Sequence, residues 1–168
     1  MELREVYEAE FGYVWNCLRR FGVPSPALED VAHDVFLVVH RRLGTYDRAR
    51  PIRPWLAGIC FRVAADHRKR AHVRYERDGL APELPSPGPT PEEAASDRER
   101  SALVLEALEA LDEAQRVVFV MHDIDGFSIP EIAAELDVKP NTLYSRLRLG
   151  RQRFTTTVRR LRAAGGRP

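Results

Sequence analysis

The sequence has few of the features that mark secreted, zinc-binding or membrane proteins. Its two cysteines, Cys17 and Cys60, stand alone without CxxC spacing, which argues against a disulfide framework and a structural zinc site. No apolar run approaches the roughly 20 residues that cross a bilayer, and the N-terminal residues lack the hydrophobic stretch of a signal peptide. We therefore expect a cytoplasmic protein with no membrane insertion.

Signatures of catalysis are missing as well. None of the five histidines stands in HxxxH or HExxH spacing, and the chain has no glycine-rich phosphate loop and no GxSxG motif. We interpret the histidines as solvated or core side chains. The sequence predicts no enzymatic activity, no metal site and no cofactor.

Acidic residues are absent from the last thirty-one positions, although the formal net charge of the whole chain is only +1. Residues 1–76 hold thirteen basic and ten acidic residues, residues 77–137 hold four and fifteen, and residues 138–168 hold nine and none. Such a cationic end gains affinity for a polyanion because counterions condensed on phosphates are released. From charge alone, a solvated basic tail is the simpler interpretation.

Strand signals are nearly absent and helical periodicity dominates, so the sequence predicts an all-α protein. The chain has 168 residues, 44% of them hydrophobic, which suits one medium domain or two small ones. Three helices are predicted in the first half: residues 3–21, a second that starts with Ser25 as N-cap and Pro26, and a third from Ile52. One buried stripe runs along the third helix, formed by Ile52, Trp55, Leu56, Ile59, Cys60, Val63, Ala64 and His67.

A proline-rich segment separates the two halves. Five prolines fall between residues 78 and 91 with almost no large apolar residues, a composition that favours an extended linker. Capping boxes are predicted at residues 90–93, 112–115 and 128–131, each opening a helix. We place two small helical domains at residues 1–76 and 101–168, joined by residues 77–100, which hold the proline-rich linker and the start of a helix.

The last part of the chain reads as a helix-turn-helix, so the second domain is predicted to be a four-helix domain of that type. Residues 137–139 form the turn, and Pro140 suits the first turn of the next helix. The inner faces of the two helices are formed by Ile129, Ile132, Ala133, Leu136, Leu143, Leu147, Gly150 and Phe154. A helix pair of this spacing can be purely architectural, but the adjacent basic residues favour DNA binding.

Two stretches resemble the extracytoplasmic-function (ECF) subfamily of sigma-70-type bacterial RNA polymerase sigma factors. The first half is similar to the −10 binding domain at residues 28–37, LEDVAHDVFL, and residues 54–70, PWLAGICFRVAADHRKR. The second half is similar to the −35 binding domain at residues 111–119, 125–133 and 141–147, which read LDEAQRVVF, DGFSIPEIA and NTLYSRL. The resemblance implies an initiation factor that binds core RNA polymerase and directs it to promoter DNA through −10 and −35 elements.

Major-groove reading by the second helix of the motif would place its N-terminal and outward side chains against base edges. The residues expected to contact the −35 element are Lys139, Asn141, Thr142, Tyr144, Ser145, Arg146, Arg148, Arg151 and Gln152. Two of them depart from the family pattern. Lys139 replaces a small polar cap, and Tyr144 replaces a commonly basic residue, so one base contact is expected to be apolar.

The −10 element is expected to meet the loop before the third helix and the polar positions of that helix. These residues are Tyr46, Arg48, Arg53, Arg62, Asp66, Arg68 and Lys69. The resemblance implies that the loop captures a flipped base, and an aromatic beside arginines suits that role; a plain surface loop is equally compatible with the sequence. Arg62 stands where the family often has Asn, and Trp55 is assigned to core packing.

The resemblance places the contact with core polymerase on the second helix, at Asp30, His33, Asp34 and Leu37. His33 stands where the family usually has Gln, and Asp34 where it usually has Glu. A solvated acidic helix start explains any one of these residues as well. The resemblance also implies an anti-sigma factor as a partner.

A different class of function fits the second half alone. A helix-turn-helix regulator can bind a palindrome as a dimer without polymerase, with the first half as a dimerising domain. An acidic helix followed by a basic, aromatic loop suits polymerase and promoter contacts better than dimerisation, and this favours the sigma-factor hypothesis.

Overall fold

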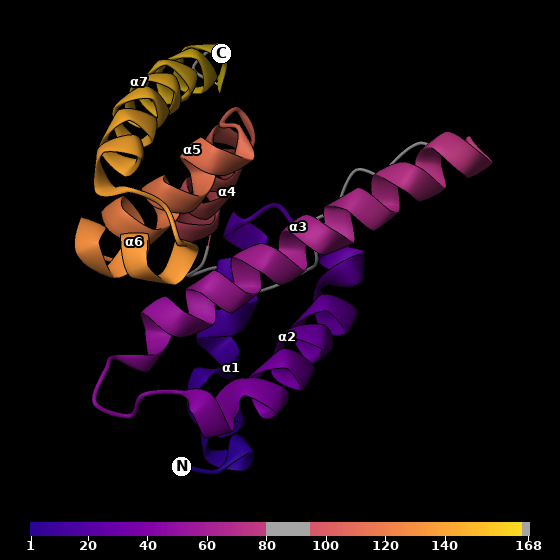
Figure 1. The fold of residues 1–168 in the computed structure, drawn as a ribbon. Helices are drawn as coiled ribbons and strands as arrows, with labels where there is room; N and C mark the ends of the chain where they lie inside the picture. Colours follow the sequence, from indigo (N-terminus) through magenta and orange to yellow (C-terminus); the bar gives the residue numbers. More distant parts are fainter. Residues whose placement is uncertain (80–94, 166–168) are drawn as a thin grey trace. The chain divides into compact units, whose positions relative to one another are not determined.

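A computed structural model describes residues 1–79 and 95–165 (Figure 1). The described residues form helices and turns and contain no strand, which confirms the all-α prediction. The elements in chain order are α1 (Leu3–Arg20), η1 (Ser25–Ala27), α2 (Leu28–Arg42), η2 (Leu43–Thr45), α3 (Ile52–Asp78), α4 (Ala95–Glu109), α5 (Glu113–Phe119), η4 (Val120–Ile124), α6 (Ile129–Leu136) and α7 (Pro140–Gly165). They divide into two compact units, whose described parts are residues 1–79 and 95–165.

The first unit is a three-helix bundle in which α1, α2 and α3 pack against one another. Each helix contributes one apolar face, and the spacing of three and four residues puts that face inside. The most completely buried side chains of this unit are Val14, Leu18, Phe21, Val31, Val35, Val39, Leu56 and Ile59. Cys17 and Cys60 are free and buried, so they serve as small core residues and form no disulfide.

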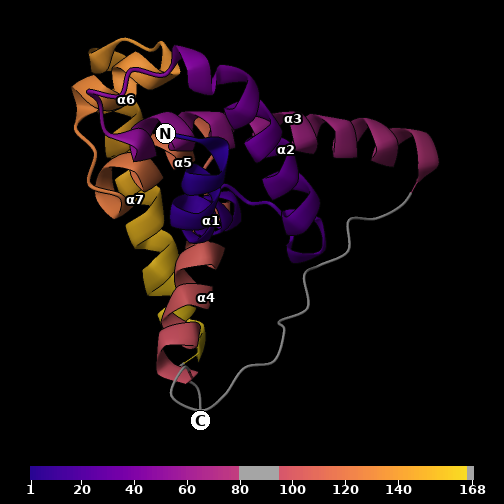
Figure 2. The ribbon, with the colours of Figure 1, turned by 90° about the horizontal axis from the view of Figure 1, so that it is seen from below.

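The second unit contains α4, α5, η4, α6 and α7. Helix α7 packs against α4, α5 and α6, and Figure 2 shows its length running beside α4. Leu108, Val118, Met121, Ile132 and Leu143 are buried where these helices meet. The predicted four-helix domain with a helix-turn-helix is therefore confirmed, with a π-helical turn, η4, inserted after α5.

Two predicted helix starts in the second unit are confirmed by their caps. The Asp112 carboxylate accepts a hydrogen bond from the Gln115 N–H at 2.8 Å, and Ser128 and Glu131 form a complete capping box at the start of α6. Caps of this kind each stabilise a helix by about 1 kcal/mol. The capping box expected at residues 90–93, and the proline-rich linker with it, lie outside the described residues.

The predicted start of the second helix is wrong in detail. Ser25 and Pro26 belong to the short 3-10 turn η1, no side chain caps that turn, and α2 begins at Leu28. Pro26 lies in a first helical turn, where its missing N–H costs nothing, but this turn is a 3-10 turn and not the first turn of the α-helix. The third helix starts at Ile52 as predicted, and the short 3-10 turn η2 at Leu43–Thr45 precedes the loop before it.

Candidate nucleic-acid interface

The helix-turn-helix is held rigidly at its turn. Asp137 ends α6 in the left-handed region with φ 54°, a conformation that Asp adopts more readily than most residues. The Val138 N–H then donates to the Ala133 carbonyl at 3.2 Å, and Pro140 opens α7. This hydrogen bond closes the C-terminal end of α6, and the packing of α6 against α7 sets the relative orientation of the two helices.

Helix α7 divides into an inner and an outer face as the sequence predicted. Leu143, Leu147 and Gly150 are buried and Phe154 is half-buried against Phe119, with ring centroids 4.5 Å apart. Gly150 lies close enough to α5 that a Cβ there would meet Gln115 Cβ at 3.4 Å. The opposite, outer face of α7 carries exposed side chains that point away from the unit's core.

Nearly all residues expected at the −35 element lie on that outer face. Tyr144 is 57% exposed, and Arg146 is the one half-buried member of the set. The exposed members are Lys139, Asn141, Thr142, Tyr144, Ser145, Arg148, Arg151 and Gln152. Leu149, which is 40% exposed, lies on the same helix and is not among the residues expected at the element.

Arg151 is exposed, but its guanidinium is held by hydrogen bonds to Asp123. Its Nε donates to Asp123 Oδ2 at 2.7 Å and its Nη2 donates to Asp123 Oδ1 at 2.6 Å, so the pair is bidentate. The hydrogen bond to Asp123 raises the pKa of Arg151 further above its ordinary value. His122, the neighbour of Asp123, donates from Nδ1 to the Phe127 carbonyl at 2.7 Å, which anchors η4 and so the carboxylate that holds Arg151.

A second arginine links α7 to the start of α5. Arg153 donates to the Gln115 side-chain oxygen at 3.3 Å and lies 3.8 Å from an Asp112 carboxylate oxygen. Asp112 is also the N-cap of α5. No local pattern in the sequence indicated these partners, because they are 28 to 41 residues away along the chain or serve as helix caps.

In the first unit, the loop before α3 is built around an aromatic pair. The ring centroids of Tyr46 and Trp55 lie 4.7 Å apart, and the Tyr46 hydroxyl donates to the Arg50 carbonyl. Trp55 is 9% exposed, so its assignment to the core is confirmed. Tyr46 is half-buried, and Arg48 beside it is exposed.

Two arginines expected at the −10 element are engaged within the first unit. Arg53 Nε donates to Glu10 at 2.9 Å, and its guanidinium lies 5.1 Å from the centroid of the Tyr13 ring. Arg68 donates to the Phe21 carbonyl at 2.7 Å and so satisfies the C-terminal end of α1. Arg62, Asp66 and Lys69 are exposed along α3.

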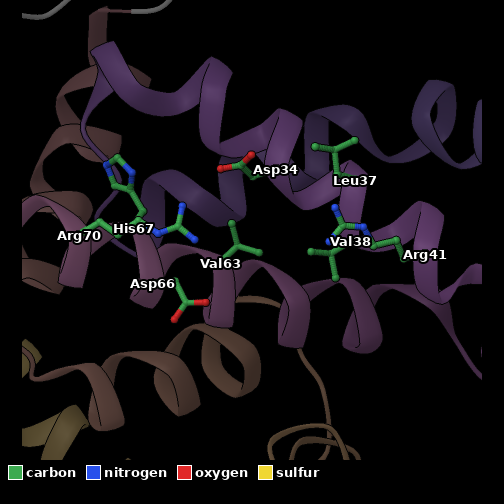
Figure 3. A pocket seen from close by; sticks show the side chains of 8 residues that line it. All are labelled: Asp34, Leu37, Val38, Arg41, Val63, Asp66, His67 and Arg70. Carbon is green, nitrogen blue, oxygen red and sulfur yellow. The ribbon is translucent and has the colours of Figure 1, made fainter.

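The four residues expected to contact core polymerase are all exposed on α2. Leu37 is 42% exposed, whereas Phe36 and Val39 on the same helix are buried. Asp34 and Leu37 also line a hollow of about 240 Å³ between α2 and α3 (Figure 3). Its lining residues are Asp34, Leu37, Val38, Arg41, Val63, Asp66, His67 and Arg70.

His67 is the titratable group in this hollow with a displaced pKa. Burial lowers the pKa of His67 from its usual 6.5, and the positive charges of Arg70, Arg74 and Arg68 lower it further, while Asp34 opposes them. The neutral imidazole is therefore the form that the folded unit favours. The hollow joins the face of α2 expected at polymerase to Asp66, expected at the −10 element.

The described part of the chain contains no group of three or more His, Cys, Asp or Glu side chains that could hold a metal ion. None of the described helices is long and apolar enough to cross a membrane.

Comparison with protein families finds two matches in one chain. Residues 6–74 match sigma-70 region 2, and residues 101–154 match sigma-70 region 4. The first match covers the packed part of the three-helix unit. The second covers α5, the helix-turn-helix and the outer face of α7 up to Phe154.

Comparison with characterised proteins finds sigma factors. The RNA polymerase sigma factor NccH of Alcaligenes xylosoxydans xylosoxydans is 31% identical over 144 residues, which are 83% of this chain and 77% of that protein. CnrH of Cupriavidus metallidurans is 30% identical over 148 residues, covering 83% and 78%. The ECF sigma factor SigE of Mycolicibacterium smegmatis is 33% identical over 131 residues, covering 75% of this chain and 49% of that protein.

Two solved structures share the fold. CnrH in complex with the cytosolic domain of CnrY aligns with a TM-score of 0.65 at 24% identity, over 92% of this chain and 85% of that one. The sigma factor RpoE in complex with the anti-sigma factor NepR from Bartonella quintana aligns with a TM-score of 0.70 at 21% identity, over 91% and 96%.

Proposed function

The chain belongs to the ECF subfamily of sigma-70 RNA polymerase sigma factors, and we propose that each of its two units reads one promoter element. As a sigma factor it binds core RNA polymerase and directs it to promoters. In this proposal residues 1–76 hold the polymerase and the −10 element, residues 101–168 hold the −35 element, and residues 77–100 connect them.

One observation carries the proposal. Matches to regions 2 and 4 occur in that order on two separate compact units of one chain, and the region 4 unit presents an exposed outer face on the second helix of its helix-turn-helix. A regulator that binds a palindrome as a dimer needs no region 2. That alternative is therefore not favoured.

At the −35 element, we assign base reading to the first four turns of α7. Arg148 carries paired donors suited to a guanine edge, Asn141 and Gln152 each carry a donor and an acceptor suited to an adenine edge, and the Tyr144 ring suits a thymine methyl group. Because the helix N-terminus carries a partial positive charge, we expect a phosphate to lie near Asn141 in the first turn of α7. Arg151 is assigned a positioning role, since its guanidinium already spans to Asp123.

At the −10 element, we assign capture of an unstacked base to the Tyr46 loop and backbone contacts to Arg48, Arg62 and Lys69. The half-buried Tyr46 ring packs against Trp55, and an aromatic side chain held in this way suits stacking with a base. Arg53 and Arg68 hold the loop and α3 against α1 through Glu10 and the Phe21 carbonyl. They support the surface that DNA meets.

We also propose that an anti-sigma factor binds this chain. The two solved structures compared above are sigma factors in complex with a second protein, the cytosolic domain of CnrY in one and the anti-sigma factor NepR in the other. A protein that covers the α2 surface around Leu37 would compete with core polymerase for the same residues.

Co-purification with core RNA polymerase tests the proposed function. The full chain is mixed with purified core enzyme and separated by size exclusion, with the separately expressed residues 95–168 as the matched control for the region 4 unit alone. Stable co-elution of the full chain supports the proposal. Elution of the full chain apart from core enzyme contradicts it.

A further inference from the structure

The hollow between α2 and α3 has a half-buried inner part and a charged rim. Figure 3 shows its lining side chains, which come from both helices. Val38, Val63 and His67 are half-buried, and Leu37 is 42% exposed. The inner part of the hollow is therefore apolar apart from one imidazole. The exposed charged side chains around it are Asp34, Arg41, Asp66 and Arg70.

The rim carries charges of both signs. Two of its side chains are acidic and two are basic, and among the described residues no hydrogen bond or ion pair joins them to one another. A nucleic-acid backbone, which is negative throughout, would be repelled by Asp34 and Asp66. A protein surface, on which charges of both signs surround apolar side chains, matches this rim better.

The volume of the hollow suits a single side chain. At about 240 Å³, it is smaller than the roughly 300–1,000 Å³ of pockets that enclose small-molecule ligands. Protein interfaces derive most of their affinity from a few side chains that fill such pockets, surrounded by contacts that exclude water. An apolar side chain of a partner protein is therefore the occupant that the size and the lining favour.

The position of the hollow indicates which protein fills it. Asp34 and Leu37 line the hollow, and both are among the residues of α2 assigned to core polymerase. The polymerase surface on α2 therefore continues into the hollow and onto Val63 and His67 of α3. A polymerase that covers Leu37 reaches the hollow without leaving that surface.

The state of His67 favours an apolar occupant. Burial lowers the pKa of His67, the charges of Arg70, Arg74 and Arg68 lower it further, and Asp34 opposes them. A side chain that enters the hollow would remove more water from the imidazole and so disfavour its charged form again. Protonation of His67 and entry of an apolar side chain therefore oppose each other.

We infer that one apolar side chain of core polymerase enters the hollow, so that Val63 and His67 of α3 join α2 in the polymerase contact and assembly requires a neutral His67. This inference rests on the proposed function, because it names a further part of the surface that polymerase covers. The contact then spans two helices of the first unit, and the pH acts on it through one imidazole.

The first test fills the hollow from inside. Val63→Phe places a larger apolar side chain in space that the hollow already provides. Val73→Phe is the matched control, because Val73 lies on the same helix, is 63% exposed and does not line the hollow. Titration of labelled core enzyme with each full-length chain measures affinity at about pH 7.5, one unit above the ordinary pKa of histidine. The denaturation midpoint of each variant is measured alongside.

Val63→Phe is expected to weaken binding to core enzyme roughly 10- to 100-fold, the loss usual when one buried anchor is excluded from an interface. Val73→Phe should bind like wild type. Both variants should keep the denaturation midpoint of wild type, because neither substitution displaces a core side chain.

The second test needs no bulky substitution, and it decides the outcome if Val63→Phe unfolds the first unit. Affinity for core enzyme is compared between wild type and His67→Gln from about pH 7.5 to 5.5. Because wild type must release the His67 proton to bind, its association constant should fall below the folded pKa by up to about tenfold per pH unit. His67→Gln should lack this part of the decline.

Other titratable and charged groups cancel in this comparison, because both proteins contain them. His33 is exposed on the same polymerase surface of α2. The charged groups that act on His67 or line the hollow with it are Asp34, Arg41, Asp66, Arg68, Arg70 and Arg74.

Wild-type affinity of Val63→Phe, or equal losses in Val63→Phe and Val73→Phe, would overturn the inference and leave the hollow to another occupant. Identical pH profiles of wild type and His67→Gln would overturn the requirement for a neutral His67. Failure of the proposed function gives a different result, because the wild-type chain then binds no core enzyme at any pH.

Discussion

Arg151 and Asp123, 28 residues apart in the chain, form a bidentate ion pair that joins the outer face of α7 to the π-helical turn η4. The relationship changes the role expected for Arg151. The Arg151 guanidinium donates two hydrogen bonds to the Asp123 carboxylate, at 2.6 and 2.7 Å. This pair holds α7 against η4 and so helps to orient the exposed side chains of α7 that precede Arg151.

Replacing either partner should therefore loosen the second unit. Asp123→Asn and Arg151→Gln are each expected to lower the free energy of unfolding by up to about 1 kcal/mol, the upper range for a solvent-accessible pair. The double variant should lose no more than one single variant does, because one interaction is removed in all three. Denaturant unfolding of the four proteins measures this coupling, and strictly additive losses would show that the pair contributes nothing.

Arg148 and Arg159 should separate specific from nonspecific binding. Arg148→Ala is expected to cost about 1–3 kcal/mol on the true −35 element and little on random DNA, because a base contact is lost. Arg159→Ala should weaken both by similar factors and reduce the salt slope by about 1. Competition binding of holoenzyme measures the ratio of affinities for the −35 element and for random DNA. Equal losses of affinity on both DNAs for Arg148→Ala would show that Arg148 does not contact a base.

Leu37 should matter for polymerase rather than for folding. Leu37→Ala is expected to weaken binding to core enzyme at least several-fold, because an exposed apolar side chain gains most of its burial energy in a complex. Leu149→Ala is the matched control, since Leu149 is exposed to nearly the same extent in the other unit. Titration of labelled core enzyme measures both, and equal affinities would place the polymerase contact elsewhere.

The first unit should lose stability in mild acid through His67. Its pKa is lowered in the folded state, so the unfolded chain binds a proton that the folded chain resists. The contribution of the neutral His67 to the free energy of unfolding is complete above the pKa of the unfolded chain, near 6.5. It is lost as the pH falls through the lower pKa of the folded unit. His67→Gln should flatten the decline of unfolding free energy below that pH; the same decline in both proteins would assign it to other groups.

Two glycines should respond to alanine in opposite directions. Gly12 lies inside α1 and a Cβ there meets nothing within 4 Å, whereas Gly126 has φ +78°. Gly12→Ala is expected to raise the free energy of unfolding by about 0.5–1 kcal/mol through helix propensity. Gly126→Ala should lower it by roughly 1–2 kcal/mol through left-handed strain. Denaturation midpoints compare the two, and destabilisation by Gly12→Ala would contradict the exposed position described.

The sequence predicts the helices of this protein well because their signals are local. Apolar spacing, the Ser128–Glu131 capping box and Pro140 each act within one or two turns, and each is confirmed in the structure. The start of α2 was misplaced because Ser25-Pro26 is compatible with both an α-helical and a 3-10 first turn. Local sequence does not distinguish the two.

The residues of the candidate DNA-binding surface can be predicted from the sequence only in part, for a related reason. The exposure of Tyr144 and Arg148 can be predicted from the spacing of apolar residues along the helix. The partners of Arg53, Arg68 and Arg151 cannot be predicted in this way, since Glu10, the Phe21 carbonyl and Asp123 are brought near by the packing of other helices. The sequence pattern predicts that these arginines contact DNA, whereas in the structure they form contacts within their own unit that stabilise the surface.

Promoter-dependent initiation in vitro tests the account most directly. Purified chain and core RNA polymerase are incubated with sheared genomic DNA and nucleotides, and run-off transcripts are sequenced, with core enzyme alone as the reference. We expect transcripts from a limited set of start sites that share two spaced upstream elements. Transcripts with the same distribution as core enzyme alone, despite a formed complex, would contradict the claim that this chain selects promoters.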